Sequence, residues 1–246
     1  MTTNRDVEGQ VPVRAKFSAG SYLGWLASPI VRDVRGDASL GLRERKKLRT
    51  RATLIDAAVD LCDRQGFDRT TVDQIAAIAD VSPRTFSRYF ATKDAIALAL
   101  IDEVLDSTAV ELARQPLELN HFEALFRAYI AMANSAKVAP AGELSADRVM
   151  CIVRIILSSP ALRQAALEFR ANSVDLEIAK RMGAGVGDRA PRLVSAVWGS
   201  MLMTAVTDLA SEGRDLSMLT IDDVVERLEV TFAEFTGLIA GNRQAV

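Results

Sequence analysis

The side chains best suited to recognise another molecule lie in one short segment, from Ser82 to Tyr89. Ser82 and Pro83 are typical of a helix N-cap and a first helical position, so the segment is predicted to be helical. Phe86 and Phe90 are four residues apart and should face inward, which leaves the polar side chains exposed. Those side chains are mainly hydrogen-bond donors, whereas the base edges and phosphates of a DNA major groove are mainly acceptors. The chemistry predicted for this helix is DNA recognition.

The position of each donor predicts its contact. Arg84 lies close to the helix N-terminus and is the best candidate for a base contact, because Arg paired with guanine is the commonest specific contact. Lys93 lies in the first turn of the next predicted helix, whose free N–H groups also favour an anion, so a phosphate contact is expected. The contact residues predicted from this region are Thr71, Ser82, Pro83, Arg84, Thr85, Ser87, Arg88, Tyr89 and Lys93.

A second candidate contact is the basic run from Arg43 to Arg51, which has six cations in nine residues. A solvated helix face would explain about three or four of these cations. Six of them directly before the donor-rich region favour a contact with phosphates or with the minor groove. The predicted contact residues of the run are Arg45, Lys46, Arg49 and Arg51.

The charge of the chain is unevenly distributed, although the net charge is only −2. Residues 41–94 contain 11 Lys and Arg against 8 Asp and Glu, whereas residues 95–246 contain 14 against 20. A basic segment joined to an acidic one is typical of a DNA-binding domain attached to a domain that does not face phosphate.

The bulk composition excludes several other classes of protein. The 246 residues are 49% hydrophobic and 25% charged, which is ordinary for a globular protein. No run approaches the 18 to 20 uncharged apolar residues of a membrane span, and no signal-peptide core is recognisable, so a cytoplasmic protein with no membrane partner is expected. Cys62 and Cys151 lie far apart in helical segments, which favours buried free thiols over a disulfide scaffold or a four-ligand zinc site.

A helix-turn-helix is predicted to position the donor-rich segment. Apolar residues recur every three or four positions from Leu48 to Cys62, which predicts a long first helix that ends at Gly66. Thr71 and Gln74 have the capping-box spacing that opens a short second helix. Two short helices that cross over a tight turn form the DNA-binding motif.

The turn between the two short helices is expected to contain Asp80, one of the few residue types that tolerate a left-handed backbone. Ile75 and Ile78 of the second helix should pack against Phe86 and Phe90 of the third. This packing would turn the donors outward.

The rest of the chain is predicted to be helical throughout, which makes the fold all-α. No alternation long enough for a strand is present, and the breaks between helices coincide with Pro and Gly. The helices are expected at roughly residues 93–114, 119–137, 143–158, 160–183, 190–211 and 220–240.

These helices carry more aromatic and thioether side chains than a simple bundle needs. Such side chains suit either plain core packing or a pocket for an apolar ligand. Arg154, within an apolar stretch, could lie on the solvent side or meet an acidic ligand. The pocket candidates are Phe122, Phe126, Tyr129, Met150, Arg154, Phe169, Trp198 and Met201.

The last two predicted helices have apolar stripes broad enough for an inner core and a second contact. Pairing them across a two-fold axis would give a four-helix bundle and a homodimer. Such a dimer presents two recognition helices to successive major grooves, about 34 Å apart, on a near-palindromic site. The predicted interface residues are Val194, Val197, Met201, Val224, Leu228, Phe232 and Phe235.

The region from about Arg49 to Ile96 closely resembles the DNA-binding domain of the TetR (tetracycline repressor) family of bacterial transcriptional regulators. The similarity covers about a fifth of the chain, and it is the order of the motifs that makes it specific. The motifs that carry it are Gly66-Phe67, Thr70-Thr71-Val72-Asp73-Gln74-Ile75-Ala76, Val81-Ser82, Thr85-Phe86, Tyr89-Phe90 and Lys93-Asp94.

The resemblance implies a domain organisation and a function. Residues 39–91 would form a three-helix DNA-binding domain, and residues 92–246 a helical ligand-binding and dimerisation domain. Residues 1–38 lack periodicity and are expected to form a flexible extension. The implied function is that of a transcriptional repressor, which binds a palindromic double-stranded operator as a homodimer and is released by a small apolar or amphipathic effector. The effector would move the long fourth helix and, with it, the DNA-binding domain.

The sequence departs from the family pattern at two positions of the recognition helix. Many relatives have Gly before its Thr and Tyr two residues after it, where this chain has Arg84 and Ser87. The phosphate contact that the resemblance implies for that Tyr is therefore not expected here in the same form, and Ser87 and Tyr89 are the candidates to replace it. Two other functions stay open: a ligand sensor or interaction protein with degenerate DNA specificity, and an unrecognised helical enzyme.

An enzyme is the least favoured of these functions. His121, the only histidine, stands beside Asn120 at a predicted helix start and is interpreted as a capping-turn residue. No phosphate-binding loop, paired carboxylates or metal-ligand spacing is recognisable, so no catalytic residue, metal or cofactor is expected.

Overall fold

The computed structural model describes residues 41–140, 143–167, 171–211 and 215–241, all of which belong to one compact unit, residues 36–246. The described residues form helices and contain no strand, as predicted. The extension expected over residues 1–38 lies outside the described residues.

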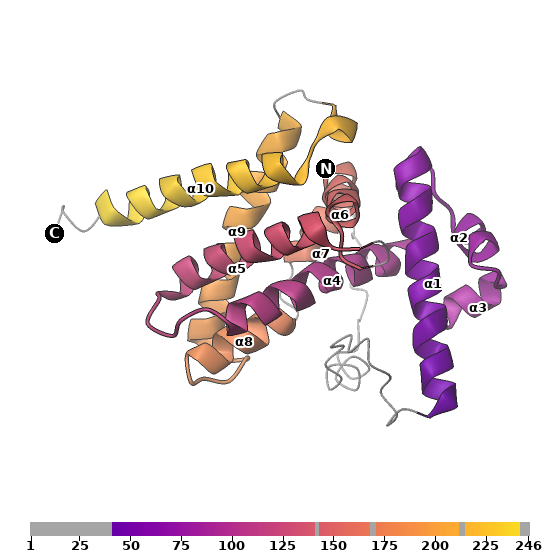
Figure 1. Cartoon of the computed structure of the whole chain (residues 1–246), viewed down its shortest axis with the longest axis horizontal. Coiled ribbons are helices and arrows are strands. Elements are labelled where there is room, and N and C mark those ends of the chain that lie inside the picture. The colour runs from indigo at the N-terminus through magenta and orange to yellow at the C-terminus, as the bar shows by residue number, and fades with distance from the viewer. Residues whose placement is uncertain (1–40, 141–142, 168–170, 212–214, 242–246) are drawn as a thin grey trace, which may run out of the picture. The chain divides into compact units, whose positions relative to one another are not determined.

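The helix-turn-helix is built from three helices, α1 (Leu42–Gln65), α2 (Val72–Ile78) and α3 (Pro83–Ser87) (Figure 1). Gly66 ends α1 with a φ of 81°, and its N–H donates to the carbonyl of Cys62. Asp80, in the turn between α2 and α3, has a φ of 52°, which confirms the predicted left-handed conformation. We call residues 41–92, which contain these three helices, the head.

The remaining helices form what we call the body. The long α4 (Lys93–Ala113) connects the head to it, and Thr92 caps this helix by accepting a hydrogen bond from the backbone N–H of Ala95. The other elements are α5 (His121–Val138), α6 (Ala146–Ser158), α7 (Pro160–Leu167), α8 (Ser173–Arg181), α9 (Arg189–Ser211), a 3-10 turn (Leu216–Met218) and α10 (Ile221–Gly241).

The prediction of one helix over residues 160–183 is wrong, because α7 and α8 are separate helices. Asn172 starts the second one by accepting hydrogen bonds from the backbone N–H groups of Val174 and Asp175. Asp175 closes a capping box by accepting from the N–H of Asn172. These bonds satisfy donors that a continuous helix would pair internally, so they favour a new start.

Two hydrophobic clusters hold the described residues together. The first joins the head to α4, α6 and α7, and it includes Ile96 and Leu100 of α4 with Cys151 and Ile155 of α6. The second lies inside the body and draws on α4, α5, α6, α8, α9 and α10. Because α4 and α6 contribute to both clusters, they connect the packing of the head to that of the body.

Ile78 does not pack against α3 as predicted, since its side chain is 46% exposed. The buried side of α2 is centred between Ile75 and Ala76, with Ala79 close by. At about 100° per residue, Ile78 lies roughly 110° from that centre and faces solvent.

One helix of the described chain, α9, is long and apolar enough to cross a membrane by length and composition alone, which the sequence analysis did not expect. Its most apolar 18-residue window has a mean hydropathy of 1.4, and 28% of that window is buried. The helix packs against α5, α6, α7, α8 and α10. Its apolar positions therefore serve the core on one side and are exposed on another.

Candidate DNA interface

Hydroxyl groups at both ends fix the backbone of α3. Ser82 accepts a hydrogen bond from the backbone N–H of Thr85 over 3.1 Å, and the two hydroxyl oxygens are 3.0 Å apart. Pro83 occupies the first turn, which confirms the predicted helix start. Ser87 donates its hydroxyl proton to the carbonyl of Pro83 over 3.1 Å. The serine and threonine hydroxyls thus stabilise the helix itself.

The inner side of α3 is anchored by its aromatic residues. Phe86 and Phe90 are buried in the head, with ring centroids 5.8 Å apart, and Ile75 of α2 is buried in the same cluster. Burying two phenylalanine side chains contributes roughly 3 to 6 kcal/mol, far more than one exposed hydrogen bond. The packing therefore decides which side of α3 faces outward.

Arg84 and Arg88 are the exposed cations of this outer side. Within the described part of the chain, neither guanidinium has an acidic or hydrogen-bonding partner. Tyr89 is half-buried beside them. The structure thus presents two guanidinium donors, unpaired among the described residues, on a short, well-anchored helix.

The start of α2 also has the predicted geometry. Thr71 accepts a hydrogen bond from the backbone N–H of Gln74 over 3.2 Å, and the Gln74 side chain accepts one from the N–H of Thr71 over 2.9 Å. This reciprocal pair confirms the capping box. The Thr71 side chain is exposed at the helix start.

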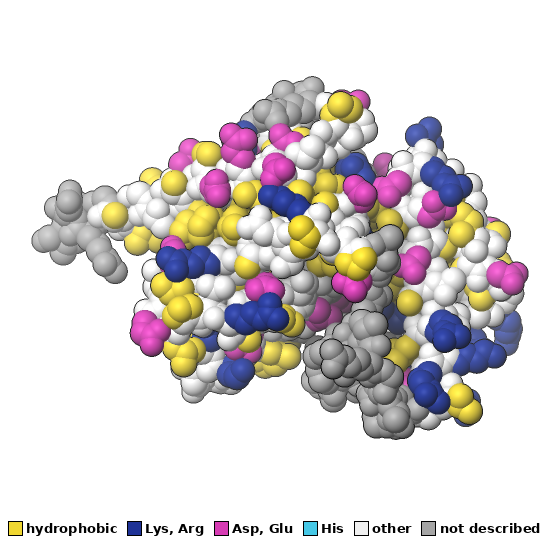
Figure 2. All heavy atoms as spheres, in the orientation of Figure 1, with side chains coloured by type: hydrophobic (Ala, Val, Ile, Leu, Met, Phe, Trp, Pro, Cys, Tyr) yellow, Lys and Arg dark blue, Asp and Glu magenta, His cyan; other side chains and the backbone are white. Residues whose placement is uncertain are grey.

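The first half of α1 carries exposed cations beside the turn that precedes α3. Arg45, Lys46 and Arg49 line a groove of about 670 Å³. Figure 2 shows Lys and Arg side chains gathered over the part of the head where α1 begins and α3 lies. The other residues that line the groove are Leu42, Thr50, Thr53, Ala79 and Val81.

Two of the predicted phosphate contacts have partners inside the protein. Lys93 donates to the carbonyl of Phe67 over 2.8 Å, and its ammonium lies 4.3 Å from the centre of the Phe67 ring. Arg51 lies over the ring of Phe90 at 5.2 Å, and burial lowers the pKa of its guanidinium although acidic residues of α4 oppose the shift. Because both cations are held by the fold, they differ from the expectation of free phosphate contacts.

The head is joined to the body by charged residues that the sequence analysis did not select. Arg148 of α6 has a side chain only 7% exposed. Its guanidinium donates to Glu103 of α4 through Nε (2.7 Å) and Nη2 (3.1 Å), and to Asp56 of α1 through Nη1 (2.8 Å). Burial alone would lower the pKa of Arg148, but these two carboxylates raise it. One arginine therefore connects three helices.

Arg154 forms a second connection. Its Nη2 donates to Asp63 of α1 over 2.8 Å at a partly exposed position, so the acidic group that it meets in this structure belongs to the protein itself. The two ion pairs, Arg148 with Asp56 and Arg154 with Asp63, link α6 to α1 in the same order along both helices. A signal was present in the sequence, since both arginines interrupt an apolar helix and both aspartates lie on α1 seven residues apart.

Most of the predicted pocket residues lie together in the body, where they form a closely packed aromatic cluster. The rings of Phe126 and Phe232 are stacked at 4.3 Å, and those of Tyr129 and Trp198 are 5.3 Å apart. Phe122 contacts Phe235 edge to face, with 5.2 Å between centroids. Met150 and Met201 are buried in the same hydrophobic cluster, whereas Phe169 lies outside the described residues.

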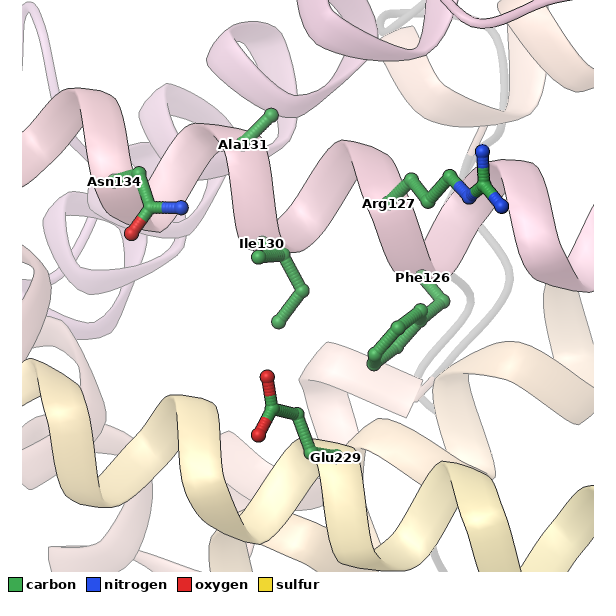
Figure 3. A pocket seen from close by; sticks show the side chains of 6 residues that line it. All are labelled: Phe126, Arg127, Ile130, Ala131, Asn134 and Glu229. Carbon is green, nitrogen blue, oxygen red and sulfur yellow. The ribbon is translucent and has the colours of Figure 1, made fainter.

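A groove of about 230 Å³ lies beside this cluster, between α5 and α10. Figure 3 shows Glu229 of α10 pointing toward Phe126 and Ile130 of α5, while Arg127 extends away along α5. Pockets for drug-sized ligands are usually about 300 to 1,000 Å³, so this groove is small for that purpose.

Two polar groups lie among the packed rings. Burial raises the pKa of Tyr129 to about 12, so its phenol is neutral at physiological pH. The buried Nε1–H of Trp198 interacts with the Tyr129 phenol and partly offsets this rise in pKa, but it does not reach full hydrogen-bond geometry. A buried donor that is incompletely paired costs up to about 1 to 3 kcal/mol, which makes this indole the weak point of the cluster.

Three of the predicted dimer residues are in the wrong place for an interface. Met201, Leu228 and Phe232 are buried within the chain, where they fill the core of the body. Val194, Val197, Val224 and Phe235 are partly buried. The exposed apolar side chains of α9 and α10 are instead Leu193, Val230, Leu238 and Ile239.

Comparisons with known proteins agree with this geometry. The family model described as "Bacterial regulatory proteins, tetR family" matches residues 54–100, which contain α2, α3, the second half of α1 and the beginning of α4. The HTH-type transcriptional regulator TcmR of Streptomyces glaucescens is 33% identical over 165 residues, which are 64% of this chain and 72% of TcmR. The HTH-type transcriptional regulator HbdR of Aromatoleum sp. (strain CIB) is 39% identical over 71 residues, 29% of this chain and 31% of HbdR.

Among solved structures, FadR of Thermus thermophilus, a TetR-family transcriptional repressor in complex with lauroyl-CoA, has a TM-score of 0.44 and 20% sequence identity. The similarity covers 74% of this chain and 92% of FadR.

The helix-turn-helix, its outward-facing arginines and the sequence relationships define the class: this is a DNA-binding transcriptional regulator. Within that class, the chain belongs to the TetR family.

Proposed function

We propose that the protein is a repressor that binds a near-palindromic operator as a homodimer and is released when a small apolar or amphipathic effector enters the body. Arg84 of α3 reads a base in the major groove, and Arg88 contacts a phosphate or a second base. The observation that carries this proposal is the pair of exposed, unpartnered guanidinium groups on a helix anchored by Phe86 and Phe90. Arg bound to guanine contributes about 1 to 3 kcal/mol of discrimination.

Arg45, Lys46 and Arg49 are the proposed phosphate contacts. All three are exposed along the groove beside the turn before α3, and a phosphate contact needs charge rather than fixed geometry. Ser82, Thr85 and Ser87 mainly position α3, because their hydroxyls bond within the helix. Lys93 and Arg51 support the head from inside.

The effector site is the aromatic cluster around Tyr129 and Trp198. An apolar effector with a hydrogen-bond acceptor would give the Nε1–H of Trp198 a better partner than Tyr129 provides, which favours opening of the cluster. Because the cluster is closed, the effector must separate rings that now touch. It shifts the equilibrium only by as much as it prefers the open state.

The change reaches the head through α4 and α6, which contribute to both hydrophobic clusters. Arg148 ties both helices to α1, so a displacement of α6 pulls on the head directly. Coupling of this kind needs a differential contact in the two states, and the ion pairs of α6 supply one.

The dimer uses the exposed apolar side chains of α9 and α10. Leu193 is 61% exposed and Leu238 is 74% exposed, and α9 is apolar far beyond what its burial within one chain requires. A second copy would cover these side chains in a four-helix bundle. This proposed dimer interface no longer includes Met201, Leu228 and Phe232.

Selection of genomic DNA fragments by the full-length protein tests the proposal. We expect enrichment of an inverted repeat whose half-sites are separated by about one helical turn. Arg84→Ala should lower the preference for one base pair in each half-site about 10- to 100-fold. The matched control is Arg114→Ala, which removes an arginine paired with Glu111 at the end of α4 and should leave the preference unchanged.

Variants that remove a positive charge from α1 test the proposed phosphate contacts separately. Arg45→Ala and Arg49→Ala should each weaken binding to all DNA sequences by the same factor, and each should reduce the slope of log Kd against log salt by about 1. If no inverted repeat is enriched, the repressor function is wrong and a sensor or interaction protein with degenerate DNA specificity is favoured.

A further inference from the structure

The two cysteines of the chain meet between the head and the body. Cys62 lies near the end of α1 and Cys151 in the middle of α6, and their thiols are hydrogen-bonded to each other. Both are buried as free thiols in the hydrophobic cluster that joins the head to α6. The two cysteines are far apart in the sequence, which argued against a disulfide, but the fold brings them together.

The contact between the thiols is held in place on both sides. Asp56 and Asp63 of α1 pair with Arg148 and Arg154 of α6, each over 2.8 Å. Cys62 and Cys151 occupy the intervening positions on the same two helices. The ion pairs therefore fix the register of α1 against α6 over the turns that carry the two sulfur atoms.

The two thiols differ in reactivity. The hydrogen bond from Cys151 lowers the pKa of the Cys62 thiol despite its burial, and the positive charges of Arg154 and Lys93 act in the same direction. The hydrogen bond to Cys62 and burial raise the pKa of Cys151. Cys62 is also 8% exposed whereas Cys151 is fully buried, so a small oxidant reaches Cys62 first. The thiolate is the reactive form, which makes Cys62 the nucleophile of the pair.

We propose that Cys62 and Cys151 are a redox-modification site that a hydroperoxide converts into a disulfide between the head and the body. The Cys62 thiolate attacks one peroxide oxygen, the O–O bond breaks, and an alcohol or water leaves after taking up a proton. The resulting Cys62 sulfenic acid is attacked by the sulfur of Cys151, which loses its proton as the S–O bond breaks and water leaves. Two thiols and one hydroperoxide give one disulfide, one alcohol (or water) and one water.

The cross-link has a mechanical consequence that rests on the proposed function. A displacement of α6 pulls on the head through the two ion pairs, and the disulfide would make that connection covalent at the same place. The oxidised protein would keep the head in its present position relative to α6, so that the two would move as one unit.

The test uses the purified full-length protein treated with excess hydrogen peroxide, alkylated and digested without reductant. We expect both thiols to disappear together and a linked peptide pair containing Cys62 and Cys151, reversed by dithiothreitol. The thermal midpoint should rise by about 5 to 10 °C on oxidation, because the bond closes a long loop. In Cys151→Ser, Cys62 should stop at the sulfenic acid, which dimedone traps.

The proposal is overturned if both thiols survive peroxide, if they oxidise separately without a linked peptide, or if the disulfide joins two chains. These readouts do not involve DNA, so their failure is distinct from failure of the repressor function. Cys62→Ser should leave Cys151 unreactive, and rapid oxidation of Cys151 in that variant would contradict the assigned order of attack.

Discussion

Arg148→Ala is the change whose effect can be worked out most directly from the structure. The side chain is 7% exposed and makes three charge-assisted hydrogen bonds, two to Glu103 and one to Asp56. Removing one partner of a fully buried ion pair costs about 3 to 5 kcal/mol. Here Glu103 is 22% exposed and Asp56 is 53% exposed, so water partly replaces the lost donors. We expect the free energy of unfolding to fall by about 2 to 3 kcal/mol.

Thermal unfolding followed by circular dichroism measures this loss. At about 2 to 4 °C per kcal/mol for a domain of this size, the midpoint should fall by roughly 5 to 10 °C. Arg127→Ala is the matched control, because Arg127 forms a single 2.7 Å ion pair with Glu123 and is 52% exposed. Exposed pairs of this kind contribute about 0.3 to 0.5 kcal/mol, so the control should melt within about 2 °C of the native protein.

A double-mutant cycle separates charge from packing. Arg148→Met keeps much of the aliphatic volume, so its loss should approach that of the alanine variant if the charge is what matters. Glu103→Gln should destabilise the native protein but should be neutral or stabilising when Arg148 is already Met, since the carboxylate is then unpaired. A midpoint for Arg148→Met indistinguishable from that of Arg127→Ala would refute the reasoning.

Other predictions concern the aromatic cluster, the turn and the dimer. The folded chain holds the Tyr129 proton up to about pH 12, whereas an unfolded tyrosine loses it near pH 10, so the stabilisation from this group is constant below about pH 10 and is lost between about pH 10 and 12. Tyr129→Phe should therefore reduce the loss of unfolding free energy over that pH range in urea titrations. A phenolate signal assigned to Tyr129 near pH 10 would disprove the burial argument. Asp80→Gly should be neutral or stabilise by up to about 1 kcal/mol and Asp80→Ala should destabilise by about 1 kcal/mol, since φ is 52°; equal unfolding free energies would contradict this. Leu193→Glu should shift sedimentation toward the monomer, whereas Leu117→Glu, at a more exposed position outside α9 and α10, should not. An unchanged dimer with Leu193→Glu would place the interface elsewhere.

The head was predictable because its signals are local. The capping box of Thr71, the N-cap of Ser82 and the turn at Asp80 each depend on residues within three or four positions of one another. Local hydrogen bonds of this kind can be recognised from the residue types and their spacing. The exposed surface of α3 followed from them, because the burial of Phe86 and Phe90 leaves only one side free.

Features that depend on contacts between distant helices were not predictable in the same way. The partners of Arg148 and Arg154, and the meeting of the two cysteines, exist only because α6 packs against α1. Three of the predicted dimer residues, Met201, Leu228 and Phe232, are buried within the chain for a related reason: an apolar stripe shows that a helix side is covered, but not whether its own chain or a second copy covers it. The break before α8 is different, because Asn172 and Asp175 carried a readable capping signal.

The ion pairs between α1 and α6 also limit how this protein can be recombined with its relatives. A chimera that joins residues 41–92 of this chain to the body of a relative would retain Asp56 and Asp63 without their arginines. The reverse chimera, with a relative's head on this body, would leave Arg148 buried beside Glu103 with one acceptor missing. The modular boundary for exchange is therefore not the end of the helix-turn-helix. A functional hybrid has to inherit the α6 positions 148 and 154 together with the head.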